Sequence, residues 1–158
     1  DAAAALLGIC GIRTYDGEPS MKLESAAKKS THVIDLPIVF MKDRDSGVPV
    51  LDTTELLLGV YELSGKYSPE TLAFAVEESL AMGISELAAS LAAKKGLEMI
   101  GLSGGVAYND HITSRIAETV TEAGFEFLGH RQVPCGDGCI SFGQAIAAGL
   151  RAGSEGTQ

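Results

Sequence analysis

The hydrophobic positions in the last third of the chain predict a strand, a glycine-rich loop and a helix. Residues 97–102 form an apolar run of strand length, which breaks at Ser103-Gly104-Gly105. After a short link, residues 110–123 have the spacing of a helix. A second unit repeats this order, with a strand at 125–128, a turn at 134–139 and a helix at 140–150. Two such units can direct two loops and two helix N-termini at one ligand.

The longest helical pattern lies in the middle of the chain. Ser68-Pro69-Glu70 is a typical helix start and Gly96 a typical end, so we predict one helix from Pro69 to Lys95. Its apolar residues predict one stripe that packs on a sheet, namely Leu72, Val76, Leu80, Ile84, Leu87 and Leu91. The acids Glu77, Glu78 and Glu86 are expected to face solvent.

The first half of the chain predicts shorter helices and one hairpin. The first ten residues have a helical pattern, and a second helix extends from Pro19 to about Lys29. Apolar runs at 36–40 and 48–51 flank a polar turn and predict a β-hairpin. Asp52 or Thr53 can then cap a helix at 54–63. We expect one domain over 1–158, with 1–95 mostly helical, 96–150 built from the two glycine-loop units, and a frayed tail.

Composition and charge narrow the classes of function. The chain has 158 residues, is 46% hydrophobic and carries a formal net charge of −9. A nucleic-acid partner is not expected, because affinity for the phosphate backbone comes from Lys and Arg. No apolar run approaches the roughly 18 residues of a membrane span, so we predict a cytoplasmic protein without a membrane partner. The start at Asp1 inside a helical pattern suggests a piece of a longer polypeptide.

The first glycine loop suits a phosphate or another oxyanion. Gly104 and Gly105 give the backbone access to positive φ and let a ligand approach the amide groups without a Cβ in the way. Asn109 stands where its side chain can either cap the next helix or reach a ligand. A tight turn without any ligand is the alternative for this Gly-Gly pair.

The second loop offers a carboxylate and two thiols. Asp137 lies between glycines, which suits a metal ion or a sugar hydroxyl, with an ordinary turn residue as the alternative. Cys135 and Cys139 would need a second ligand pair to bind zinc, and a catalytic thiolate there would have only His130 as a base nearby in sequence. Cys10 lies in an apolar helical run and is predicted to be a buried packing residue.

These loops resemble those of a known family. The segments Leu102-Ser-Gly-Gly-Val-Ala-Tyr-Asn109 and Arg131-Gln-Val-Pro-Cys-Gly-Asp-Gly-Cys-Ile-Ser-Phe-Gly-Gln144 are similar to the last third of the HypF carbamoyltransferases, which mature nickel–iron hydrogenases. The likeness extends over nearly the whole chain and includes residues 1–9, 15–24 and 50–52.

The resemblance implies an α/β fold, the second lobe of an actin-like or sugar-kinase-like ATPase, with a mixed sheet flanked by helices. HypF-like enzymes make carbamoyl adenylate from carbamoyl phosphate and ATP, and they pass the carbamoyl group to a cysteine of HypE. The implied cofactors are ATP or carbamoyl adenylate and a divalent metal (Fe, Zn or Mg). The implied partners are a HypE-like maturation protein and the missing first lobe, in cis or in trans.

The resemblance also implies roles for individual residues, although it identifies no catalytic residue. The nucleotide- and phosphate-binding set would be Ser103, Gly104, Gly105, Asn109, Gly17 and Glu24, with Gly17 and Glu24 beside the ribose or adenine. Asp137 would be the metal-binding carboxylate.

Departures from the family pattern bear on activity. The family loop PPNDGG reads Pro134-Cys-Gly-Asp-Gly-Cys139 here, and Glu77 takes the place of a histidine that often opens the long helix. The three histidines of this sequence do not form the pair that holds the family's metal. We therefore expect the chain to be incomplete by itself. Two alternatives stay open: a non-catalytic domain that docks a maturation partner, and a small-molecule kinase lobe of the same fold group.

Overall fold

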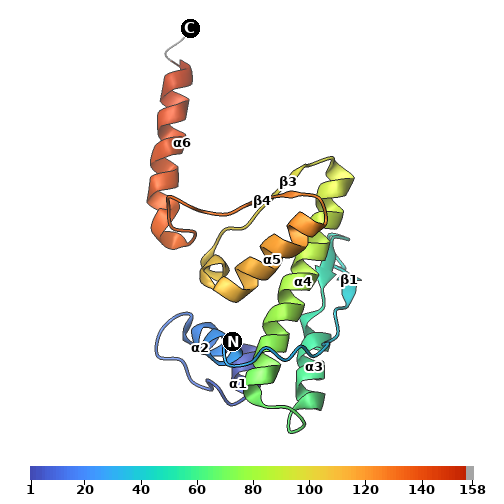
Figure 1. Cartoon of the computed structure of the whole chain (residues 1–158). Helices are drawn as coiled ribbons and strands as arrows, with labels where there is room; N and C mark the ends of the chain where they lie inside the picture. Colours follow the sequence, from blue (N-terminus) through green and yellow to red (C-terminus); the bar gives the residue numbers. More distant parts are fainter. Residues whose placement is uncertain (156–158) are drawn as a thin grey trace.

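One long central helix organises the fold (Figure 1). The computed structural model describes residues 1–155, and side chains for residues 1–152. The elements are, in chain order, α1 (Ala2–Leu6), α2 (Glu18–Ala27), β1 (Phe40–Lys42), β2 (Pro49–Leu51), α3 (Thr53–Leu63), α4 (Pro69–Lys95), β3 (Met99–Gly101), η1 (Gly105–Tyr108), α5 (Asp110–Glu122), β4 (Glu126–Leu128), η2 (Asp137–Cys139) and α6 (Ile140–Glu155). No helix within residues 1–155 combines the length and apolar character that a membrane span requires.

The central helix α4 begins and ends where the sequence predicts. The Ser68 hydroxyl accepts a hydrogen bond from the Thr71 backbone N–H at 3.2 Å, and Pro69 occupies the first turn. Gly96 ends the helix in the left-handed region, with φ 64°. The predicted boundaries are therefore confirmed.

The predicted packing of α4 on a sheet is wrong in part. The helix contacts α1, α2, α3 and α5 as well as β2 and β3, and most of its contacts are with the helices. Small residues such as Ala73, Ala75 and Ala81 are fully buried and let these helices approach closely, whereas Ile84 of the predicted stripe is 44% exposed. The stripe of large apolar residues therefore did not predict the helix–helix contacts that α4 makes through its alanines.

The first half of the chain packs α1, α2 and α3 around the N-terminal part of α4 (Figure 1). Their shared core consists of Ala3, Ala4, Cys10, Leu23, Ala26, Ala27, Leu36, Leu56, Val60, Ala73, Ala75 and Val76. Cys10 is buried as predicted, although α1 ends before it. The Asp52 carboxylate caps α3 by accepting a hydrogen bond from the Thr54 N–H at 2.9 Å.

The predicted hairpin is confirmed, but its first strand is shorter than expected. β1 and β2 pair antiparallel, with Phe40 opposite Leu51. Residues 36–39 are not a strand, because Pro37 cannot donate a ladder hydrogen bond and packs instead on α3. A Cβ at Gly59 of α3 would lie only 2.6 Å from Pro37 Cδ, so glycine is required for this contact.

The second half of the chain confirms both predicted strand–loop–helix units. β3 and β4 pair in parallel, with Ile100 opposite Phe127. Their core with α5 and α4 consists of Ala81, Ile112, Ile116 and Val120, packed against Ile100, Leu102, Phe125 and Phe127. The α/β class is confirmed, but the strands form two separate two-stranded sheets rather than one mixed sheet. Because β3 and β4 run in parallel, the loops that follow them leave from the same edge.

The last helix, α6, extends away from the other elements (Figure 1). It packs chiefly against η2, and residues 140–150 are all exposed. Phe142, Ile146 and Leu150 recur every fourth residue and are 53%, 51% and 72% exposed. The predicted fraying after Leu150 is wrong as far as Glu155, where the helix ends, and residues 156–158 lie outside the described residues.

Candidate functional site

The two glycine loops lie side by side, as the sequence predicts. The Gly104 backbone N–H donates a hydrogen bond to the Cys135 carbonyl at 2.7 Å, and the Ser103 hydroxyl donates to the same carbonyl at 3.2 Å. On the other side of the contact, the Gly136 N–H donates to the Tyr108 hydroxyl at 3.4 Å. Because both loops follow parallel strands, these bonds hold them together at the carboxyl edge of the β3–β4 sheet.

Glycine is needed in these loops for different reasons. Gly104 has φ 106°, a conformation that residues with a side chain rarely adopt. A Cβ at Gly105 would meet nothing within 4 Å, so open space lies above this residue. A Cβ at Gly136 would lie 2.7 Å from Tyr108 Cε2, so the close approach of the two loops depends on glycine there.

A cavity of about 430 Å³ opens at the ends of the two strands. It is lined by Gly101, Leu102, Ser103, Leu128, Gly129 and His130. The His130 Nε2 atom lies 3.0 Å from the Ser103 hydroxyl oxygen. This histidine therefore contacts Ser103 of the first loop. From the sequence, His130 is considered only as a base for the nearby cysteines, so the contact with Ser103 is not predicted. Cys10, Cys135 and Cys139 are all free thiols.

Asn109 caps helix α5, which is one of the two roles that the sequence allows. Its Oδ1 atom accepts a hydrogen bond from the Ile112 N–H at 2.9 Å. Its amide Nδ2 donates to Glu77 Oε1 at 2.8 Å. An asparagine amide carries two hydrogens, and this bond uses one of them. The loop end is thus tied to both α5 and α4.

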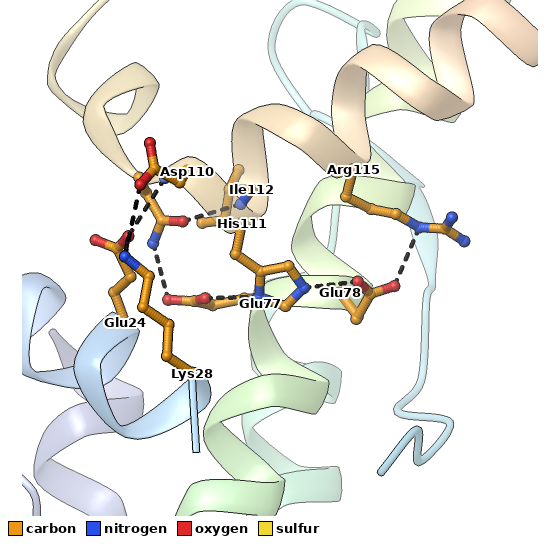
Figure 2. Close-up of polar contacts among 9 residues, drawn as sticks. Glu24, Lys28, Glu77, Glu78, Asp110, His111, Ile112 and Arg115 are labelled. Carbon is orange, nitrogen blue, oxygen red and sulfur yellow. Dashed lines mark hydrogen bonds and ion pairs between the residues drawn. The ribbon is translucent and has the colours of Figure 1, made fainter. Parts of the chain in front are cut away.

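A network of charged side chains joins α4 to α5 beside this loop (Figure 2). His111 Nδ1 lies 2.9 Å from Glu77 Oε2, and His111 Nε2 lies 2.7 Å from Glu78 Oε1. Arg115 Nε lies 3.0 Å from Glu78 Oε2, as an ion contact without a well-directed hydrogen bond. Phe74 stacks on the His111 ring, with ring centroids 4.6 Å apart.

The expected exposure of the α4 acids is wrong for two of the three. Glu77 is only 1% exposed, and the Glu78 side chain is 16% exposed, whereas Glu86 does face solvent. Burial raises the pKa of Glu77, and the hydrogen bonds from Asn109 and His111 partly oppose this rise. A sequence signal for this network exists in His111 and Arg115, which are four residues apart and share one face of α5.

Glu24 joins the same region from α2 (Figure 2). Its Oε1 atom accepts a hydrogen bond from the Asp110 N–H at 3.3 Å and contacts Lys28 Nζ at 2.8 Å. Lys28 Nζ also lies 3.6 Å from Asp110 Oδ2. The structure therefore brings Glu24 to the start of α5, beside Asn109. Gly17 caps α2 with φ 84°, and within residues 1–152 no hydrogen bond or ion pair links it to either loop.

Asp137 is exposed and begins η2 on the second loop. Within the part of the chain that the structure describes, no group of three or more His, Cys, Asp or Glu side chains is placed to hold a metal ion. Three or more protein ligands are usual for a catalytic zinc ion, for example. The residues present therefore do not form a metal centre by themselves, and Asp137 can supply at most one ligand oxygen pair.

Comparisons with known proteins agree on one family. The family described as "Carbamoyltransferase, Kae1-like Domain, second subdomain" matches residues 1–144. A probable carbamoyltransferase HypF of Methanocaldococcus jannaschii is 41% identical over 154 residues, which are 97% of this chain and 19% of that protein. The carbamoyltransferase HypF of Rhodobacter capsulatus is 32% identical over 152 residues, 96% of this chain and 19% of that protein.

Solved structures agree with these sequence matches. The crystal structure of T. kodakarensis HypF superposes with a TM-score of 0.81 and 34% identity, over 98% of this chain and 19% of that one. A full-length HypF in the phosphate- and nucleotide-bound form gives a TM-score of 0.79 and 29% identity, over 92% of this chain and 19% of that one. This chain thus spans about a fifth of the length of these relatives, at 19%. It belongs to the HypF carbamoyltransferase family, in which it corresponds to the second subdomain of the Kae1-like domain.

Proposed function

We propose that this chain binds ATP or carbamoyl adenylate at its two glycine loops, as one subdomain of a carbamoyltransferase. The observation that carries the proposal is the hydrogen bond from the Gly104 N–H to the Cys135 carbonyl, which joins the loops at the open edge of two parallel strands. A relative solved in a phosphate- and nucleotide-bound form, 29% identical over 92% of this chain, supports it.

The donors to a phosphate are the first amides of η1. The N–H groups of Gly105 and Val106 make no backbone hydrogen bond in the described structure, and the Gly104 N–H is used to join the loops. Gly105 leaves open space above these amides. We therefore assign phosphate contact to Gly105 and Val106, and we assign to Gly104 the task of holding the second loop in place.

In the transfer reaction, the thiolate of an acceptor cysteine on a HypE-like partner attacks the carbamoyl carbon. The S–C bond forms while the bond from carbon to the adenylate oxygen breaks, and AMP leaves. Amide groups that hold the phosphate stabilise the charge on this leaving group. If a divalent metal takes part, Asp137 would supply one ligand and residues outside the described ones would supply the others.

The remaining part of the reaction machinery is proposed to come from the other subdomain of the Kae1-like domain, in cis or in trans. The other subdomain could contact α6 through the exposed stripe of Phe142, Ile146 and Leu150. Covering large apolar side chains on an exposed helix removes them from water and stabilises the contact. We use the term assembled protein for this chain together with that subdomain. The cytoplasmic location stays a prediction from the sequence.

Calorimetric titration of the assembled protein with ADP and ATP tests the proposal. Gly105→Val places a side chain over the amides at a position where a Cβ meets nothing within 4 Å, so it should weaken nucleotide binding at least about tenfold with little effect on folding. Gly11→Val is the matched control, because a Cβ there also meets nothing within 4 Å and the residue lies far from the loops in sequence. Equal affinities for the two variants would contradict the role of the first loop.

The metal ligand is tested separately, by elemental analysis of the assembled protein. Asp137→Ala should lower the bound metal content, with little effect on folding because the side chain is exposed. Unchanged metal content would show that Asp137 is not a ligand.

A non-catalytic docking domain is the second candidate function. The exposed apolar stripe on α6 favours it, as does the incomplete set of metal ligands within the described residues. The same titration separates the two candidates. If the assembled protein binds neither ADP nor ATP, the docking role is the better explanation of the conserved fold.

A further inference from the structure

The histidine between α4 and α5 has an arrangement that simple packing does not require. Both ring nitrogens of His111 face carboxylate oxygens, at 2.9 Å in Glu77 and 2.7 Å in Glu78 (Figure 2). Glu77 is 1% exposed, and Phe74 covers one face of the ring. Water therefore has little access to the Glu77 side of this contact.

The geometry sets the number of protons in this cluster. A neutral imidazole carries one N–H and one bare nitrogen lone pair. In either tautomer, the bare nitrogen would face a carboxylate oxygen less than 3 Å away, and two lone pairs at that distance repel. The arrangement therefore needs one extra proton, on the imidazole or on one of the two carboxyl groups. The raised pKa of Glu77 acts in the same direction.

The charged groups around the cluster also favour keeping this proton. The groups that face it from the neighbouring helices are Glu24 and Lys28 of α2 and Asp110, Arg115 and Glu118 of α5. Lys28 is already paired with Glu24 and Asp110, and Arg115 with Glu78 and Glu118. In addition to burial, the nearby negative charge of Glu24 raises the pKa of Glu77, which favours keeping a proton in the cluster.

The cluster is linked to the first glycine loop through one side chain. Glu77 Oε1 accepts the amide of Asn109 at 2.8 Å, while Asn109 itself caps α5. The Asn109 backbone N–H donates to the Val106 carbonyl at 2.9 Å, at the end of η1. A movement of Glu77 would thus be passed to η1, whose first amides are the proposed phosphate donors.

We propose that Glu77 and His111 are positioning residues which, by sharing one proton, hold Asn109 and η1 in the arrangement that binds nucleotide. Loss of that proton leaves a neutral ring whose one bare nitrogen faces a carboxylate, and this repulsion loosens the link between α4 and α5. Nucleotide affinity then falls as the pH rises. This inference rests on the proposed nucleotide binding and adds its dependence on protons.

The variant Glu77→Gln tests the inference directly. A glutamine amide can accept from Asn109 through its oxygen and donate to His111 Nδ1 through its nitrogen, so both contacts persist without the extra proton. ADP affinity of the assembled protein is measured by calorimetry from about pH 6 to about pH 9, the range in which imidazoles and raised carboxyl groups titrate. Over this range the affinity of the wild type should fall about tenfold more than the affinity of Glu77→Gln.

Glu86→Gln on the exposed side of α4 is the matched control and should follow the wild type. Titration of the nucleotide phosphates is common to all three proteins and cancels in the comparison. The side-chain amide NMR signals of Asn109 provide a second readout, and they should shift with pH in the wild type but not in Glu77→Gln.

The outcomes distinguish the role of the shared proton from the nucleotide binding on which it depends. A Glu77→Gln variant with the same pH slope as the wild type overturns the role of the shared proton while nucleotide binding stands. A wild type that binds no ADP at any pH overturns the proposed function and, with it, this inference.

Discussion

Replacing Gly136 with alanine should push the two glycine loops apart. The new Cβ would lie 2.7 Å from Tyr108 Cε2, and 3.4 Å is the shortest ordinary distance for such a contact, so the ring must move by about 0.7 Å. The backbone of Gly136 has φ −103°, outside the left-handed region that favours glycine, so the contact with Tyr108 should cause most of the effect.

The expected cost follows from the exposure of the ring. Overpacking of a closed core costs about 1–3 kcal/mol, but Tyr108 is 58% exposed and can turn toward solvent, which favours the lower end. Rotation of the Tyr108 ring would also break the 3.4 Å hydrogen bond from the Gly136 N–H to the Tyr108 hydroxyl. Loss of so long a bond costs about 0.5 kcal/mol. Together these terms lower the free energy of unfolding by about 1–2 kcal/mol, which lowers the melting temperature by about 2–8 °C. If the two loops jointly bind the nucleotide, the ADP affinity should also fall about tenfold.

Thermal unfolding and ADP calorimetry on the assembled protein measure both effects. Gly138→Ala is a matched control in the same loop, because its Cβ would lie an ordinary 3.9 Å from Pro134 Cβ. The double variant with Tyr108→Ala removes the obstructing ring, so Gly136→Ala should then be almost neutral. Equal effects of Gly136→Ala and Gly138→Ala, or an undiminished effect in the Tyr108→Ala background, would refute the reasoning.

Three further predictions address the core, the α6 surface and the pH dependence of stability. Leu56→Ala removes a side chain that is 2% exposed and should lower the free energy of unfolding by about 2–4 kcal/mol in urea, and a loss below about 1 kcal/mol would contradict its place in the core. Ile146→Lys should weaken association with the other subdomain in sedimentation experiments without lowering the melting temperature of this chain, and unchanged association would exclude the α6 stripe as the contact. Glu18 has a pKa lowered to about 2 by Lys22 and by the N–H and hydroxyl of Thr14, so its contribution is present above the usual value of 4.5 and is lost as the pH falls toward 2. Glu18→Gln should therefore flatten the loss of stability between these pH values, and an acid unfolding curve identical to the wild type would contradict this.

Local sequence signals were sufficient to predict the elements whose ends are set by residues with a strongly preferred backbone conformation. Ser68, Pro69 and Gly96 act within a turn of the helix that they bound, and the structure confirms all three. The two strand–loop–helix units were predictable for the same reason, and the parallel order of their strands then placed both loops at one edge. The convergence of the loops thus follows from features that are visible in the sequence.

Long-range contacts were not predictable in this way. Glu77 has the helical position of a solvated acid, and only the approach of α5, with His111 on its inner face, makes it a buried group. Similarly, His130 and Ser103 are 27 residues apart and meet because β3 and β4 are neighbours. The sequence of one element does not show which side chains of another element will contact it in the fold.

The buried carboxylate of Glu77 is a poor means of stabilising the contact between α4 and α5. Removing a carboxylate from water costs several kcal/mol, and well-packed apolar side chains at such positions are often more stabilising than a buried ion pair. The neighbouring contacts of Ile112 and Ile116 show that this interface can be built from apolar residues. What an apolar side chain at position 77 could not do is accept the amide of Asn109, which fixes the end of the first glycine loop. The position of this hydrogen-bond acceptor beside that loop, and not a gain in stability, is therefore the physical reason to connect this network with ligand binding.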